Sequence, residues 1–327
     1  MRRRLLRQSL CAILGGLSFC FLAGTPAALT AAFAHSCSQE IGRACVVTTT
    51  SELASLATAT LGDLAHVESI IPSGADPEGF EPRPSDLAKL KDARMLVRVG
   101  LGYDHWLERL ISLHGNASVK RGGPGYVDVS RGIPLLEVKG RSLDPTSSDG
   151  HAHGQANPHY WLDPANAELI TAAIAEAMIR LDESTSTKVI AQRDDFLNQL
   201  SARLQNWERM LLPYRGAPLV AYHNTWPYFA RRFRLDIVDV IESKEGVSPS
   251  PSRLARLAAL MRERGVRVIV HEPFAPSDVS ELLARRTGAT LVRLSPSVGS
   301  PADVADYSGL FDYNVDALVR SLAATPD

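Results

Sequence analysis

The stretch NPHYWLDP, residues 157–164, marks the point where the sequence pattern of this chain changes. Its last two residues, Asp163 and Pro164, combine an N-cap acid with a proline in the first turn, which predicts the start of a helix. From Pro164 to Leu212 the residues are helix formers with helical spacing and no strand pattern. Because this spacing is interrupted near residues 182–184, we predict consecutive helices, the last a long linking helix at residues 185–212.

On both sides of this helical segment, short β-branched runs alternate with stretches of helical spacing. This alternation is typical of parallel sheets whose strands are joined by crossover helices. We therefore predict an α/β fold made of two α/β units. The expected strands are residues 46–49, 67–71, 95–99, 219–222, 237–240, 266–270 and 290–294, and the expected helices about 52–61, 85–93, 252–264, 277–287 and 304–323.

Residues 1–34 have the layout of a secretory signal peptide: arginines after Met1, an apolar stretch from about residue 10 to 22, and small residues before the cleavage point. The apolar stretch is too short and too rich in glycine for a membrane span. We expect an exported, periplasmic protein. Lipid anchoring is not expected, because the residues before Cys37 form a poor lipoprotein motif.

The composition after residue 34 limits the classes of function. Only Cys37 and Cys45 remain, and in an oxidising compartment two nearby cysteines predict a disulfide. The full chain has a formal net charge of −1, which gives no basic surface for nucleic acid. Roughly three hundred residues are enough for one large hydrophobic core or two moderate ones.

Three side chains in different segments are candidate metal ligands. His159 lies beside two prolines on the approach to a helix, a rigid position for a ligand, although a lone histidine is more often structural. Glu78 follows the strand that ends at Ile71, and His223 follows the strand at residues 219–222. Ligands collect beyond the carboxyl ends of parallel strands. A carboxylate with two imidazoles suits a borderline divalent ion such as zinc or manganese.

These segments resemble a known family, the cluster 9 or TroA-like periplasmic receptors of zinc and manganese ABC importers. The resemblance extends over nearly all of the chain after residue 34, and its motifs are specific when taken together. They are GADPEGFEPRPSD (74–86), GLGYDHWL (100–107), PHYWLDP (158–164), HNTWPYFA (223–230), PSP (249–251) and EP (272–273).

The resemblance implies two similar lobes, each a parallel sheet flanked by helices, with a long linking helix and a metal cleft between the lobes. We expect an N-terminal lobe at 35–184, the linking helix at 185–212 and a C-terminal lobe at 213–327. It also implies a binding protein without catalytic turnover or organic cofactor, which delivers its metal to a membrane permease with a separate ATPase. We expect a monomer.

Position by position, His159 and His223 match ligands of the family. Glu78 stands where the family has a histidine, so either it binds through oxygen or the first ligand is lost. The usual fourth ligand, an acid, is replaced by Ser295, whose neutral hydroxyl is a poor ligand. Glu272 and His271 are the candidates to replace it, with residue 245, a glutamate, more remote.

Zinc is the favoured ion and manganese the next, since one or two carboxylates in the site shift preference toward manganese or iron. A polar segment at about 142–156 is expected to be a mobile loop. Its His151 and His153 either pass metal toward the cleft or belong to a solvated loop.

Two other classes of protein stay open. A metal-independent adhesion or scaffold protein on the same fold is compatible with the changes at Glu78 and Ser295. An exported zinc hydrolase with Glu272 as general base is less favoured, because the chain has neither a His-Glu-x-x-His motif nor a Ser-His-Asp arrangement. We predict a receptor and not an enzyme.

Overall fold

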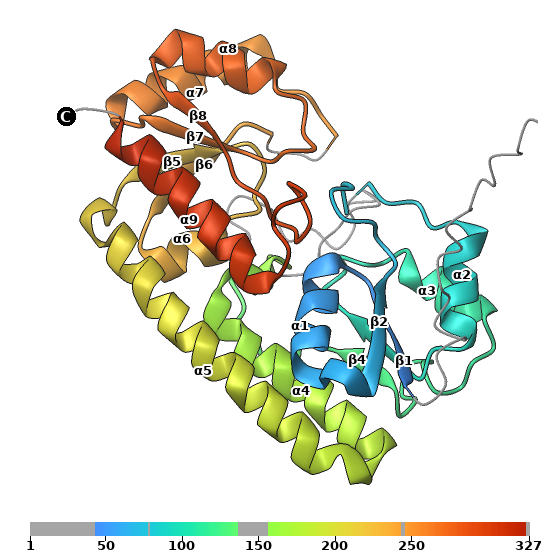
Figure 1. Ribbon diagram of the computed structural model, residues 1–327. Helices are drawn as coiled ribbons and strands as arrows, with labels where there is room; N and C mark the ends of the chain where they lie inside the picture. The colour runs from blue at the N-terminus through green and yellow to red at the C-terminus, as the bar shows by residue number, and fades with distance from the viewer. Residues whose placement is uncertain (1–42, 78, 137–155, 243–245, 325–327) are drawn as a thin grey trace, which may run out of the picture. The chain divides into compact units, whose positions relative to one another are not determined.

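The computed structural model describes residues 43–77, 79–136, 156–242 and 246–324 (Figure 1). The predicted signal peptide, Cys37, Glu78, and His151 and His153 of the predicted loop lie outside the described residues, and so does the glutamate at position 245. The predictions made for these residues therefore stay predictions.

The first sheet is parallel and is covered on both faces, which is why its central strand, β1, is buried at every residue. Val46 on β1 packs into the core on one face, and the next residue, Val47, packs into a separate core on the other face. The strand order is β2-β1-β3-β4. The elements are β1 (Ala44–Thr48), α1 (Ser51–Leu61), β2 (Ala65–Ser69), α2 (Pro84–Lys91), β3 (Met95–Arg98), α3 (Leu107–Leu113) and β4 (Tyr126–Asp128).

The second sheet repeats this plan, again with all strands parallel and in the equivalent order β6-β5-β7-β8. Val220 on β5 and Ile269 on β7 face a core that includes Leu257 of α7. The elements are β5 (Pro218–Ala221), α6 (Pro227–Phe233), β6 (Asp236–Val240), α7 (Pro251–Glu263), β7 (Val268–His271), α8 (Asp278–Thr287), β8 (Thr290–Arg293) and α9 (Tyr307–Ala323).

Two long helices connect the sheets, α4 (Ala167–Leu181) and α5 (Ser186–Leu211), with one 3-10 turn between them at the predicted interruption. The 26 residues of α5 span about 39 Å, and this helix contacts α1, α4 and α9 (Figure 1). Asp312 on α9 accepts hydrogen bonds from Trp207 Nε1 at 2.8 Å and Arg203 Nη1 at 2.6 Å. The predicted fold class, two parallel sheets flanked by helices and joined by a long linking helix, is confirmed.

One cysteine of the chain lies among the described residues. Cys45, buried at the start of β1, is disulfide-bonded. The other cysteines of the chain lie outside the described residues, so the pairing with Cys37 stays a prediction. No helix within the described ranges is both long and apolar enough to cross a bilayer.

Candidate metal centre

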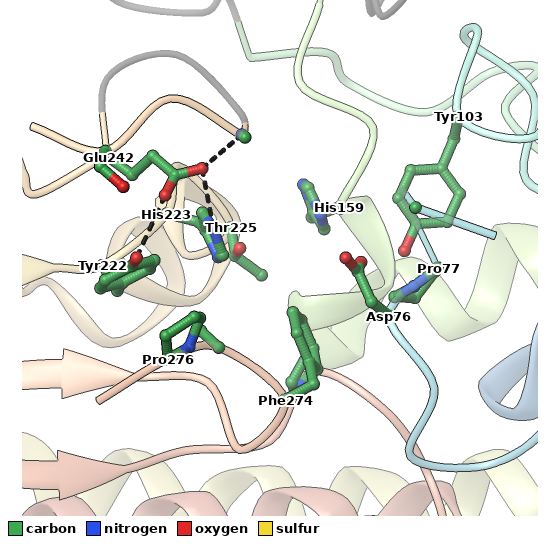
Figure 2. Close-up of a pocket in the computed structure, with 15 residues that line it drawn as sticks. Asp76, Pro77, Tyr103, His159, Tyr222, His223, Thr225, Glu242, Phe274 and Pro276 are labelled. Carbon is green, nitrogen blue, oxygen red and sulfur yellow. Dashed lines mark hydrogen bonds and ion pairs between the residues drawn. The ribbon is translucent and has the colours of Figure 1, made fainter. Parts of the chain in front are cut away.

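A cavity of about 390 Å³ is lined by loops that follow the strands of both sheets. Figure 2 shows its polar side chains, which come from segments far apart in the sequence. The position agrees with the expectation that ligands collect at the carboxyl ends of parallel strands. The lining residues are Asp76, Pro77, Gly79, Tyr103, His159, Tyr222, His223, Thr225, Glu242, Gly246, Ser248, Phe274, Ala275, Pro276 and Pro296.

His159 is held rigidly at the start of a 3-10 turn and is only 6% exposed. Its Nδ1 lies 3.1 Å from Asn157 Oδ1, which also accepts the His159 backbone N–H. Because a carboxamide oxygen only accepts, Nδ1 is the donor, and in the neutral ring Nε2 is the nitrogen with the lone pair. A metal-binding histidine is commonly oriented in this way, by an oxygen at its second nitrogen.

The segment that carries His159 is anchored to both halves of the molecule. Tyr160 donates through its hydroxyl to Val99 O at 2.6 Å, in the first half. Trp161 Nε1 donates to Pro296 O at 2.9 Å, and Tyr307 OH donates to Trp161 O at 2.5 Å, in the second half. The position of His159 is therefore fixed by contacts to both halves of the molecule.

His223 lies between two carboxylates. Its Nδ1 is 3.3 Å from Glu272 Oε2, and its Nε2 is 3.6 Å from Glu242 Oε1. Glu272 is fully buried, and its other oxygen accepts a hydrogen bond from Trp226 Nε1 at 2.7 Å. Phe274 stacks on the imidazole, with ring centroids 6.2 Å apart. Glu272 therefore lies behind His223 and outside the cavity lining, where its Oε2, which has no hydrogen-bond partner among the described residues, places a carboxylate beside the ring.

Two further carboxylates, Asp76 and Glu242, line the cavity, and neither is a candidate ligand in the sequence analysis. Glu242 accepts hydrogen bonds from Tyr222 OH at 3.1 Å and Gly246 N at 2.6 Å (Figure 2). Burial and then the Glu242 charge raise the pKa of Tyr222 to about 12, so this hydroxyl stays a donor. Glu242 follows β6 directly, and the rule that selects His223 after β5 would have selected it.

Two further residues have structural contacts: the candidate His271, and Ser295, which stands at the usual fourth ligand position. His271 is 1% exposed, with Nε2 3.1 Å from Ala275 O and Nδ1 3.0 Å from Ser280 Oγ, and burial lowers its pKa. The Ser295 hydroxyl donates to Ser297 O at 2.9 Å. Neither residue lines the cavity. His271 instead fixes the loop that carries Phe274.

The candidate ligands do not form one compact group. Within the described residues, no three histidine, cysteine, aspartate or glutamate side chains are arranged to hold one ion together. His159 and Asp76 lie on one side of the cavity, and His223 and Glu242 on the other (Figure 2). An ion shared by both sides would require these side chains to approach one another.

Comparisons with known proteins agree with this fold. The chain is 24% identical over 282 residues to the high-affinity zinc uptake system protein ZnuA of Bacillus subtilis, covering 85% of this chain and 87% of that protein. It is also 24% identical over 284 residues to the manganese-binding lipoprotein MntA of Halalkalibacterium halodurans, covering 85% and 88%. A crystal structure of a zinc-bound ZnuA deletion mutant matches with a TM-score of 0.73 at 27% identity, covering 87% of this chain and 100% of that one.

The family described as zinc-uptake complex component A, periplasmic (ZnuA), matches residues 46–321, which include both sheets and the linking helices. The chain belongs to this family.

Proposed function

We propose that this chain is an extracytoplasmic receptor that binds one divalent transition metal ion in the cavity and delivers it to the permease of an ABC importer. It carries out no reaction on the ion. The observation that carries the proposal is that His159 and His223, from separate segments, line one cavity together with the carboxylates of Asp76 and Glu242. The zinc and manganese names of its relatives support the same class of ligand.

Zinc is the first choice of ion and manganese the second. Imidazole nitrogens favour zinc, whereas carboxylate oxygens are better ligands for manganese. The cavity offers both kinds, and relatives at equal identity carry names for each metal. The choice between the two ions therefore depends on how many of the carboxylates of Asp76 and Glu242 bind.

Metal binding is proposed to draw the two sides of the cavity together. An ion that contacts His159 on one side and His223 on the other stabilises the arrangement in which both are within bonding distance. The carboxylate of Glu272 and the amide oxygen of Asn157 keep the two rings oriented before the ion arrives. The long helix α5 limits the closure to a small movement.

The test is a titration of the chelator-stripped protein with zinc and with manganese, combined with elemental analysis. We expect one equivalent of metal, and at least a hundredfold weaker binding in the His159→Ala/His223→Ala double variant, since two ligands are lost. His105→Ala, which changes an exposed histidine, is the matched control and should bind as the parent does. No stoichiometric uptake by the parent would favour the metal-independent scaffold, and unchanged uptake by the double variant would place the ion elsewhere.

Glu272→Gln is expected to weaken metal binding roughly ten- to a hundredfold while the stoichiometry stays at one. The amide keeps the shape and still accepts from Trp226 Nε1, but it removes the charge beside His223 Nδ1. The measurement is the metal affinity and stoichiometry of Glu272→Gln and of the parent protein, obtained by titration calorimetry. An affinity equal to that of the parent would show that Glu272 does not orient the ring. A change of stoichiometry would instead make Glu272 part of the ligand set.

A further inference from the structure

A second cavity has a volume of about 320 Å³. It lies between the C-terminal end of α5, the C-terminal end of α6 and Asp163. It shares no lining residue with the metal cavity. Four arginines and two acids line it, so the formal charge of its wall is +2. The lining residues are Asp163, Glu208, Leu212, Arg215, Arg231, Arg232, Phe233 and Arg234.

One of the two acids, Asp163, is fully engaged. Its side chain is 2% exposed and accepts from Arg232 Nε at 2.6 Å and Nη2 at 3.1 Å. It also accepts from Arg231 Nη2 at 3.4 Å and from the Ala165 backbone N–H at 3.1 Å. The guanidinium of Arg231 lies 5.5 Å from the centre of the Tyr228 ring. Asp163 therefore orients two guanidiniums and presents little charge to the cavity.

The positive charge of the other two arginines is not balanced in the same way. Arg215 and Arg234 are exposed, and in the described part of the chain no carboxylate forms an ion pair with either. Arg234 has a φ of 57°, in the left-handed region that favours glycine or asparagine. Glu208, 46% exposed, lies 3.7 Å from Arg232 Nη1 and is the one further acid of the wall.

We propose that this arginine cluster binds a doubly charged oxyanion, a phosphate group. The paired N–H groups of an arginine guanidinium match the spacing of phosphate oxygens. The guanidiniums of Arg231 and Arg232 are already oriented by Asp163. The charge of a dianion matches the +2 of the wall. The wall also contains Leu212 and Phe233, so it accepts either free phosphate or the phosphate group of a small organic molecule. The proposal does not depend on the metal site.

The test is a titration of the metal-free protein with inorganic phosphate, and separately with glycerol phosphate, at constant ionic strength set by chloride. We expect saturable binding at one site, weakened at least tenfold in the Arg215→Ala/Arg234→Ala double variant. The matched control is Arg256→Ala/Arg286→Ala, which removes two exposed arginines on α7 and α8 and leaves the cavity intact. Tighter binding of glycerol phosphate would support an organic phosphate as the occupant.

Equal weakening in the two double variants would overturn the proposal, because net charge alone would then explain the effect. An absence of saturable binding in the parent would also overturn it. Since Arg215 and Arg234 are exposed, thermal unfolding without phosphate is expected to be unchanged, and this measurement separates lost binding from lost folding.

Discussion

A Glu52→Gln variant is expected to unfold at a higher temperature than the parent protein at pH 8, and at nearly the same temperature at pH 4. Glu52 lies in the first turn of α1 and is fully buried. Ser51 Oγ donates to its Oε2 at 3.2 Å, whereas Oε1 has no hydrogen-bond partner among the described residues. Burial therefore outweighs the hydrogen bonds that favour the charged form, and it raises the pKa of Glu52 from 4.5 to about 7.

The direction of the pH dependence follows from this raised pKa. Between pH 4.5 and 7 the folded protein holds a proton on Glu52 that the unfolded chain has lost, so the free energy of unfolding falls as the pH rises. Above pH 7 the loss is complete and amounts to about 3 kcal/mol. Glutamine cannot ionise, so the variant avoids this loss, and the gain at pH 8 corresponds to roughly 5–10 °C in a protein of this size.

Thermal unfolding of both proteins at a series of pH values between 4 and 8 is the measurement. Glu168→Gln is the matched control, because Glu168 also lies in the first turn of a helix, α4, but is exposed. If the unfolding temperatures of Glu52→Gln and its parent differ by the same amount at every pH from 4 to 8, Glu52 does not titrate in this pH range.

Asp104→Ala is expected to destabilise the protein by about 3–5 kcal/mol, because it leaves a buried cation without its main partner. Asp104 is fully buried and accepts from Arg98 Nε at 3.0 Å and Nη2 at 2.6 Å. It also accepts the backbone N–H groups of Val99 at 2.8 Å and Gly100 at 3.3 Å. Arg98 itself is only 4% exposed, so water cannot replace the lost carboxylate.

The matched control is Glu108→Ala, which removes the other acid paired with Arg98. Glu108 is 44% exposed, and exposed ion pairs contribute about 0–1 kcal/mol. Denaturant unfolding of both variants gives the comparison. Equal losses of stability would mean that burial does not determine the strength of these two pairs. Asp104 also supports the turn before Tyr103, so its loss is expected to weaken metal binding, whereas Glu108→Ala should not.

The sequence predicts the parts of the fold that have strong periodicity. The helices α4 and α5, the interruption between them and seven of the eight described strands follow from helix formers and β-branched runs. The three-residue strand β4 and the seven-residue helix α6 are absent from the prediction. Elements of this length contain too few residues for a period to be recognised, and sheet pairing determines β4.

The candidate site is predicted less completely, because the direction of a side chain depends on local geometry. His271 and Glu272 are adjacent in the sequence, and successive side chains of an extended chain point to opposite faces. His271 therefore meets Ser280 of α8, while Glu272 meets Trp226 and His223. The loops after β2 and β6 place Asp76 and Glu242 at the cavity, which motif comparison alone did not indicate.

The equal strand order of the two sheets has a consequence for how the metal site forms during folding. Asp76 follows the edge strand β2, and Glu242 follows its counterpart β6, so each half supplies part of the donor set. On the proposed function, a chain in which only one half has folded lacks the donors of the other half. Such an intermediate cannot retain the ion, so metal loading requires that both halves have folded.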